Sequence, residues 1–338
     1  MQDAARPPDP LADILRAMRL TGGVFLEASF TSPWCVLSHV EPGDCAGFLP
    51  LPRHIIAYHY VCAGQLALQV DGEKPVIAQS GDIVILPRND RHRIGSDLQS
   101  APLDVNDLFE PGEGSDPARL IYGCATSADT RFFCGFLGHD QSSDPLISAL
   151  PRVLHLRLAD TAASEWIESS LRFASSRRPT LEENGDSGMS SAMLGKLAEL
   201  LFLQAVRRYL QDPLAPATVW IAGLRDPMVG RALALMHNEQ EQARAWTADA
   251  LARAVGLSRS AFAERFTSLV GDPPMRYLTQ RRLQQAARRL AETTDPIARI
   301  AEEAGYESEP AFHRAFKRLY EVTPAGWRRQ QANPDAKP

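Results

Sequence analysis

The chain has 338 residues, 36 Lys and Arg against 41 Asp and Glu, and only five Cys, none of them in a C-x-x-C pair. This length fits two domains and a connector, and the cysteines indicate neither a disulfide framework nor a zinc ribbon. No apolar run reaches the roughly 18 residues of a membrane helix, and the N-terminus has no apolar signal core, so we expect a cytoplasmic protein with no membrane partner.

Charge is divided unevenly along the chain. Residues 226–338 contain 17 Lys and Arg and 14 Asp and Glu, a net charge of +3, whereas the first 225 residues carry −8. The C-terminal part is therefore weakly basic although the whole chain carries −5. Such a distribution favours a modest, salt-dependent affinity of the C-terminal part for nucleic acid.

Short strands are predicted in parts of the N-terminal half of the chain. Between residues 55 and 94 the chain alternates in short apolar runs separated by Gly, and Asp71-Gly72 is typical of a hairpin turn. Further strands are predicted near residues 119–124 and 130–136, after an expected loop at 101–117 that is rich in Asp, Pro and Gly. Regular short strands of this kind predict an antiparallel β-barrel or jelly roll.

Helices replace strands from about residue 161. Residues 189–211 form one amphipathic helix by their periodicity. Its apolar face packs either against its own domain or against the same helix of a second copy, so a homodimer is one interpretation. The face consists of Leu194, Leu197, Leu201, Ala205 and Val206.

A helix-turn-helix pattern occurs twice in the last hundred residues, from Leu251 to Phe266 and from Ile300 to Phe316. Each copy has a Gly, Gly256 or Gly305, where the turn requires a positive φ. A small helical bundle is the alternative interpretation, but two aligned copies favour a protein that binds DNA. The apolar stripe of the second helix in each copy is predicted to be Phe262, Phe266 and Leu269, then Phe312, Phe316 and Leu319.

The segment between the two copies reads as one helix. Residues 273–292 would span roughly 30 Å at 1.5 Å per residue. That is close to the ~34 Å between successive major-groove segments on one side of B-DNA. We therefore expect both recognition helices to contact one face of the DNA. Arg281 and Arg288 are predicted on the polar side of this helix, either solvated or in contact with phosphates.

With this repeat, the chain resembles the AraC/XylS family of transcriptional regulators over about residues 231–329, most specifically in residues 297–329. The resemblance implies a sequence-specific regulator rather than an enzyme, with double-stranded DNA and RNA polymerase as partners. Family base-contacting positions, carried over, fall on Ser260, Ala263 and Glu264, and on Pro310, His313 and Arg314. Candidates for phosphate contact are Arg259, Arg265, Lys317 and Arg318.

The N-terminal part resembles a cupin, the ligand-binding domain of one branch of that family, over about residues 11–158. Gly81, Pro87 and His92 match the spacing G-x5-P-x4-H of the second cupin motif. The positions of the first motif hold Leu, Arg and Ala here, so no metal or other cofactor is expected. Three histidines, His54, His59 and His92, are potential metal ligands. The alternative interpretation is therefore a metal-dependent cupin enzyme fused to a DNA-binding domain.

The predicted effector-binding residues are His59, Cys62 and His92, and no catalytic residue is expected. The effector is either a small molecule or an oxidant that reacts with thiols, whereas the plainer interpretation of the cysteines is burial in the core. The predicted organisation is a sensing domain at 1–158, a helical linker with a possible dimerisation role at 159–225, a DNA-binding domain at 226–330 and a flexible tail at 331–338. The predicted fold class is α+β.

Overall fold

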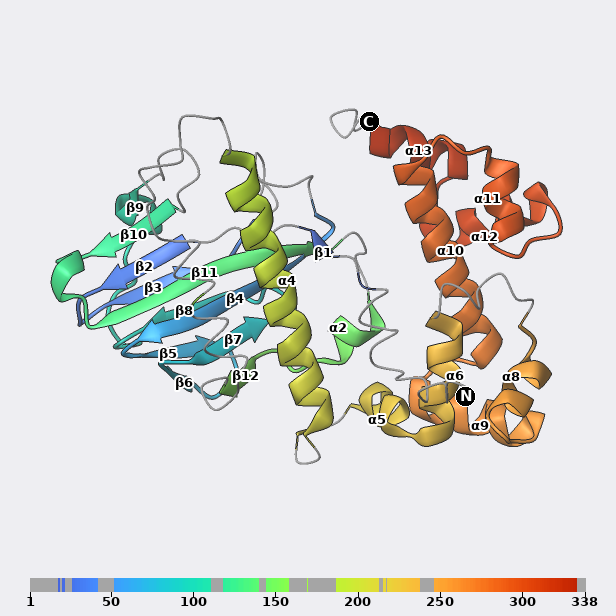
Figure 1. The fold of residues 1–338 in the computed structure, drawn as a ribbon, viewed down its shortest axis with the longest axis horizontal. Helices are drawn as coiled ribbons and strands as arrows, with labels where there is room; N and C mark the ends of the chain where they lie inside the picture. The colour runs from blue at the N-terminus through green and yellow to red at the C-terminus, as the bar shows by residue number, and fades with distance from the viewer. Residues whose placement is uncertain are drawn as a thin grey trace, which may run out of the picture. The chain divides into compact units, whose positions relative to one another are not determined.

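The computed structural model describes residues 26–41, 52–110, 118–139, 144–157, 187–212, 218–237 and 246–332, with positions 18, 20–21, 169 and 215–216. The chain divides into two compact units, one ending at residue 216 and the other made mainly of the C-terminal remainder. The first is built mostly of strands and the second of helices (Figure 1), which confirms the α+β class. The domain limits at 158, 225 and 330 stay predictions, and residues 333–338 of the expected tail lie outside the described residues.

The larger sheet orders its strands β12-β7-β4-β11-β2-β10-β9, and β1 pairs with β11. Its two longest strands, β4 and β11, pair antiparallel and place His59 opposite Cys134. Strands β10 and β2 pair parallel, an exception to the predicted antiparallel pattern. The strands are β1 (Leu20–Thr21), β2 (Leu26–Phe30), β4 (His54–Ala63), β7 (Asp82–Leu86), β9 (Phe109–Glu110), β10 (Ala118–Tyr122), β11 (Thr130–His139) and β12 (Leu154–Arg157).

The smaller sheet has the order β3-β8-β5-β6. Its strands are β3 (Cys35–Ser38), β5 (Gln65–Val70), β6 (Val76–Gln79) and β8 (His92–Gly95). The predicted turn after β5 is present, with Gly72 at a φ of 84°. Apolar side chains from both sheets share one core, among them Phe30, Leu68 and Val84. The predicted jelly-roll arrangement is confirmed as two packed sheets, and the larger sheet does not close into a barrel within the described residues.

Short helical segments connect these strands. They are η2 (Val105–Leu108), η3 (Ala125–Ser127) and α2 (Pro145–Ala149). The carboxylate of Asp144 accepts hydrogen bonds from the first backbone N–H groups of α2, which explains why that helix begins there. Segment η2 lies within the expected loop at 101–117, and residues 111–117 of that loop lie outside the described residues.

Helix α4 (Ser187–Gln211) confirms the predicted amphipathic helix. It packs against β11 and β1 of its own unit (Figure 1), and its buried side chains include Leu201, Ala205 and Val206. Of the predicted apolar face, these three residues are therefore buried and Leu197 is half-buried, while Leu200 is 49% exposed. The Leu194 side chain lies outside the described residues, and a homodimer stays a prediction.

The helical unit contains the two predicted helix-turn-helix motifs, α8–α9 and α11–α12, on either side of the long helix α10 (Figure 1). The single helix predicted at 273–292 is confirmed as α10, with Pro273 as its N-cap. The helices are α5 (Val219–Arg225), α6 (Pro227–His237), α8 (Ala248–Ala254), α9 (Arg259–Val270), α10 (Pro274–Glu292), α11 (Ile297–Glu303), α12 (Glu309–Tyr320) and α13 (Pro324–Ala332).

Both turns have the predicted geometry, with Gly256 at φ 77° and Gly305 at φ 80°. All four Phe of the predicted stripes are fully buried. The prediction for Leu319 was wrong, because this side chain is 39% exposed. Its counterpart Leu269 is half-buried, and α5 lies close to it because residue 223 is Gly: a Cβ there would lie only 2.9 Å from the Leu269 carbonyl oxygen.

Helix α10 belongs to both motifs. Near its start, the Tyr277 ring lies 5.7 Å from that of Phe266, and in α13 the Trp327 ring lies 5.9 Å from that of Phe316. The Trp327 indole N–H donates to the carbonyl of Ala287, in the C-terminal half of α10, at 3.0 Å. Arg281 also faces inward at 6% exposure, which corrects its expected place on a solvated face.

Candidate functional site

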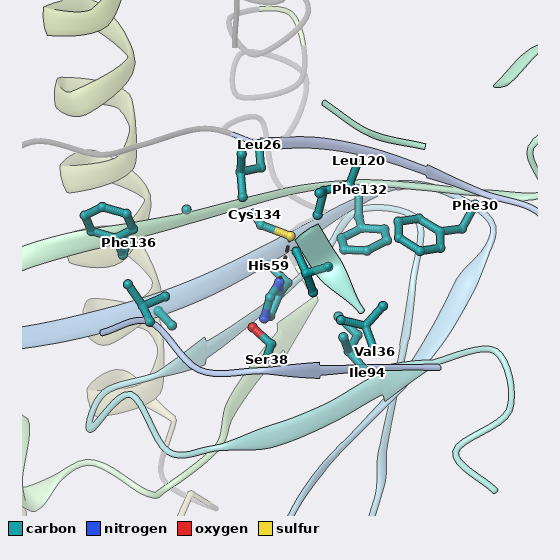
Figure 2. Close-up of a pocket in the computed structure, with 14 residues that line it drawn as sticks. Leu26, Phe30, Val36, Ser38, His59, Ile94, Leu120, Phe132, Cys134 and Phe136 are labelled. Carbon is teal, nitrogen blue, oxygen red and sulfur yellow. Dashed lines mark hydrogen bonds between the residues drawn. The ribbon is translucent and has the colours of Figure 1, made fainter. Parts of the chain in front are cut away.

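A pocket lies in the N-terminal unit between the two sheets (Figure 2). Its empty volume is about 610 Å³, part of it open to solvent. Among the described residues that line it, only Ser38, His59 and Cys134 carry polar side chains. The full lining is Leu26, Phe30, Val36, Ser38, Val40, Ala57, His59, Ile94, Val105, Leu120, Phe132, Cys134, Gly135 and Phe136.

A chain of hydrogen bonds leads from the pocket into the protein. His92 Nδ1 lies 2.8 Å from the carbonyl oxygen of Asp90, and since a carbonyl only accepts, this nitrogen carries the proton. His92 Nε2 is then the acceptor for the Nε2–H of His59 at 2.8 Å. His59 Nδ1 is left to accept from the Cys134 thiol at 3.2 Å. One tautomer of each histidine satisfies the whole chain, with no charge on any member.

The pKa shifts of the three hydrogen-bonded side chains agree with this neutral state. Burial, and then the neighbouring His92, hold the pKa of His59 well below its ordinary value. Burial lowers the pKa of His92 to about 4. Burial also raises the pKa of the Cys134 thiol above its ordinary value. Near pH 7 the hydrogen-bonded group at the polar end of the pocket therefore consists of two neutral imidazoles and an un-ionised thiol.

The predicted effector residues occupy different places. His59 lines the pocket, and His92 lies directly behind it. Cys62 does not line the pocket, because adjacent strand residues face opposite sides and residue 62 is an odd number of positions from His59. The thiol that lines the pocket beside His59 is that of Cys134. Sequence reasoning missed it because the contact joins residues 75 positions apart on β4 and β11.

The three histidines considered for a metal do not converge. His54 Nε2 lies 2.6 Å from the Pro87 carbonyl oxygen, a partner separate from the His59–His92 pair. Across the described ranges, no group of three or more His, Cys, Asp or Glu side chains is arranged to hold a metal ion.

The remaining described thiols, Cys35 and Cys124, differ in how readily they ionise. Burial raises the pKa of Cys35. Cys124, in contrast, is exposed, and hydrogen bonds from the Thr126 and Ser127 hydroxyls and backbone lower its pKa to about 7. Of these two thiols, Cys124 is the one with appreciable thiolate at neutral pH.

The first recognition helix, α9, begins where the Ser258 hydroxyl accepts a hydrogen bond from the Ala261 N–H at 3.3 Å. Near this end Arg259, Ser260 and Glu264 are exposed, and Ala263 is half-buried. The front of α9 therefore presents one cation, one hydroxyl and one carboxylate from the predicted set.

Arg265, predicted to contact phosphate, forms an ion pair with another residue of the same unit. Its guanidinium donates to the carboxylate of Asp226, with Nε at 3.0 Å from Oδ2. Asp226 also accepts from the N–H groups of Met228 and Val229 at 3.0 Å, so it caps α6. Arg265, first among several causes, holds the pKa of Asp226 below its ordinary value. The pair joins α9 to the start of α6.

The second recognition helix, α12, presents a more basic surface. Pro310, Arg314, Lys317 and Arg318 are exposed, and His313 is half-buried with Nε2 3.4 Å from Glu309 Oε1. Within the described part of the chain, Arg314 and Lys317 form no ion pair. These two cations are therefore available to an external anion.

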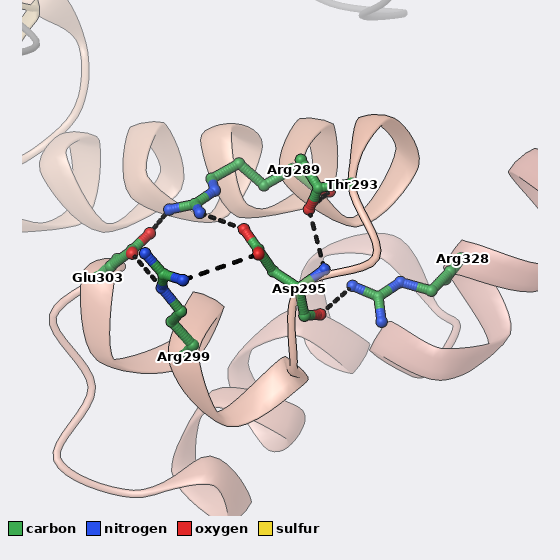
Figure 3. A network of polar contacts seen from close by, with 6 residues as sticks. All are labelled: Arg289, Thr293, Asp295, Arg299, Glu303 and Arg328. Atoms are coloured by element: carbon green, nitrogen blue, oxygen red, sulfur yellow. Dashed lines mark hydrogen bonds and ion pairs between the residues drawn. The ribbon is translucent and has the colours of Figure 1, made fainter.

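A network of ion pairs and hydrogen bonds surrounds Asp295 in the second motif (Figure 3). Arg289 on α10 pairs with Asp295 and Glu303, and Arg299 Nε lies 3.2 Å from Glu303 Oε1. Arg328 on α13 donates to the Asp295 carbonyl oxygen at 2.6 Å. The network connects α10, α11 and α13, and sequence spacing showed none of its longer-range pairs.

Comparison with known proteins matches both units. Residues 9–211 match the family described as Cupin, and residues 251–330 match the family described as Helix-turn-helix domain. A relative from Streptomyces lividans described as an AraC-like transcription regulator is 31% identical over 330 residues, which is 96% of this chain and 100% of that protein. The chain belongs to the AraC-like transcription regulators.

Two further proteins are similar to this chain. The HTH-type transcriptional regulator AlkR of Acinetobacter baylyi is 30% identical over 84% of this chain and 90% of its own length. A solved AraC-type DNA-binding domain from Chromobacterium violaceum is 30% identical, covers 33% of this chain and 98% of its own, and has a TM-score of 0.31. Within the described residues, no helix is long and apolar enough to cross a membrane.

Proposed function

We propose that this AraC-like regulator reads DNA through α9 and α12, and that a small molecule in the pocket between its sheets controls that reading. The observation that carries the proposal is the exposed front of two matching recognition helices. Each is held by the same buried Phe pair and starts after the same Gly-containing turn. The fronts of such helices enter the major groove in helix-turn-helix proteins.

The proposal assigns different roles to the exposed residues. On α12, Arg314 and His313 contact bases, with Pro310 beside them, while Lys317 and Arg318 contact phosphates. On α9, Ser260, Ala263 and Glu264 contribute weaker base contacts, and Arg259 contacts phosphate. Arg265 contributes by holding α9 to α6, because its guanidinium is already paired with Asp226.

DNA selected from a random duplex library by the full-length protein would test this assignment. Arg314→Ala should weaken binding of the selected sequence by about 10- to 100-fold, the value of a bidentate guanine contact. The matched control is Arg253→Ala on α8, an exposed cation paired with Asp249 and outside both recognition helices, which should change affinity little. Equal effects of the two changes, or no sequence enriched by selection, would contradict the proposal.

For the pocket we propose binding without chemistry, which sets it apart from the metal-dependent enzyme considered above. The neutral His59–His92 pair and the apolar lining support this role. Metal analysis of the purified protein tests the alternative, which requires about one Fe, Mn, Ni or Zn per chain, lost in His92→Ala. We further propose that the DNA-bound regulator acts in the cytoplasm on RNA polymerase, which transcription reconstituted on the selected DNA would measure.

A further inference from the structure

We infer that the pocket takes an uncharged, largely apolar molecule that carries one hydrogen-bonding group, and that Ser38 holds this group. The inference rests on the proposed function, since it names the class of effector for the same pocket. It follows from which side chains line the pocket, what their polar atoms already bind, and where Ser38 lies.

The described lining of the pocket carries no formal charge. No Lys, Arg, Asp or Glu is among the described residues that line the pocket. An anionic ligand would find no cation there and a cationic ligand no carboxylate. Moving an unpaired ion from water into such surroundings is strongly unfavourable. The described lining therefore discriminates against any formal charge.

The hydrogen bonds at the polar end of the pocket already engage His59 and Cys134. Both ring nitrogens of His59 are engaged, one with His92 and one with Cys134. The Cys134 thiol uses its proton on His59, and a thiol sulfur is only a weak acceptor. These two residues shape the polar end of the pocket but have little capacity left for a ligand.

Ser38 is the remaining polar side chain of the described lining. It lies on β3, and Figure 2 shows its hydroxyl directed towards His59 inside the pocket. Among the described residues the hydroxyl has no hydrogen-bond partner. It can both donate and accept, so it suits a ligand alcohol, ether or carbonyl equally. One such group on the ligand matches the one free polar group of the described lining.

The rest of the lining sets the apolar body of the ligand. Phe30, Phe132 and Phe136 come from neighbouring strands and line the pocket with aliphatic side chains. Trp34 is stacked on Phe132, with ring centroids 5.6 Å apart and planes 10° apart. A ligand that moves Phe132 should therefore change the Trp34 fluorescence, with Trp34→Phe as the control for the signal.

A matched series on one carbon skeleton tests the inference on the full-length protein at pH 7.5. The probes are 4-phenylbutan-1-ol, n-butylbenzene, 4-phenylbutanoate and 4-phenylbutylammonium, measured by calorimetry and by fluorescence. We expect the alcohol to bind most tightly and both ions at least about 100-fold more weakly. The carboxylate should gain about tenfold in affinity from pH 8 to pH 7, because it enters as the neutral acid.

Two variants locate the contact. Ser38→Ala should weaken the alcohol by about threefold to tenfold and leave n-butylbenzene unchanged. Val105→Arg, at the half-buried edge of the pocket on η2, should raise the affinity of the carboxylate at least about tenfold without a comparable gain for the alcohol.

The outcomes separate the two claims. An ion that binds as tightly as the alcohol, no binding of any member, or an equal loss of alcohol and hydrocarbon in Ser38→Ala would overturn the inferred class. Affinity for the selected DNA is measured in the same samples with and without the alcohol. If the alcohol binds but DNA affinity does not change, the ligand class stands and the proposed control of DNA binding fails.

Discussion

The two helix-turn-helix motifs share an interior and differ at their surfaces and edges. In both, the recognition helix has two fully buried Phe, and the second of them packs on an aromatic ring one helix further on, Phe266 on Tyr277 and Phe316 on Trp327. The front of α9 offers Ser260 and Glu264, whereas α12 offers Arg314 and Lys317. The pattern that folds the motif is the same in both copies, while the residues that would meet DNA are not.

The contacts that attach each motif to the rest of the helical unit also differ. The first motif is covered by α5 and fixed by the Arg265–Asp226 pair, and its recognition helix ends at Gly271 with a φ of 92°. The second is fixed by the network around Asp295 and ends at Glu321 with a φ of 63°. Each copy therefore has its own means of attachment to the unit, which can be perturbed separately.

The strongest perturbation should be the loss of a core ring. Phe266→Ala and Phe316→Ala should each lower the free energy of unfolding by about 3–5 kcal/mol, because each leaves a large cavity. Urea unfolding of the full-length protein measures this. Leu319→Ala is the control and should cost less than about 1 kcal/mol, since Leu319 is 39% exposed. Unequal costs for the two Phe would show that the motifs are not equivalent inside.

Acid should separate the two motifs. The Tyr277 hydroxyl contacts His237 Nε2 at 2.8 Å, where the second motif has the Trp327–Ala287 bond. Burial, first among its causes, holds the pKa of His237 well below 6.5. Below pH 6.5 the unfolded chain binds the extra proton and the folded chain does not, so stability is full above that pH and falls as the pH decreases.

Hydrogen exchange of α6 and α13 measures that difference locally. Protection in α6 should fall from pH 7 to pH 5, after correction for intrinsic exchange rates, while protection in α13 changes less. His237→Gln should remove most of the pH dependence in α6. A parallel loss in both helices would mean that the two motifs open together.

Salt dependence of DNA binding should distinguish the two kinds of Arg and Lys. Lys317→Ala should reduce the slope of log affinity against log salt by about 1, because one phosphate contact is lost. Arg265→Ala should leave that slope unchanged and cost about 1 kcal/mol or less of stability, since the Arg265 side chain is 51% exposed. A reduced slope in Arg265→Ala would place this residue on the DNA.

The smallest effect should come from the ends of the recognition helices. Glu321→Gly should stabilise the protein by about 1 kcal/mol, because a side chain at positive φ is strained and Gly is not. Gly271→Ala should destabilise it by a similar amount, as nothing within 4 Å would contact the new Cβ and only the backbone conformation opposes it. Thermal unfolding measures both, and the same sign for the two changes would refute the argument.

Features set by local sequence were predictable, and those set by distant contacts were not. The turns at Gly256 and Gly305 and the buried Phe pairs follow from spacing within about twenty residues. The exposure of Leu319 was predicted wrongly because burial at that stripe position needs a helix outside the motif. The Arg265–Asp226 pair spans 39 residues and the His59–Cys134 contact spans 75, so neither had a signal in residue spacing.

Helix α10 runs without interruption for 19 residues from the first motif into the second. In an α-helix each residue adds about 1.5 Å and about 100° of rotation. A single residue inserted in its middle would therefore turn one recognition helix by about 100° relative to the other while hardly changing their separation. If both recognition helices bind DNA as proposed, the helix would fix their angular phase as well as their distance, and the residue count of this one element would set the spacing of the half-sites in an operator.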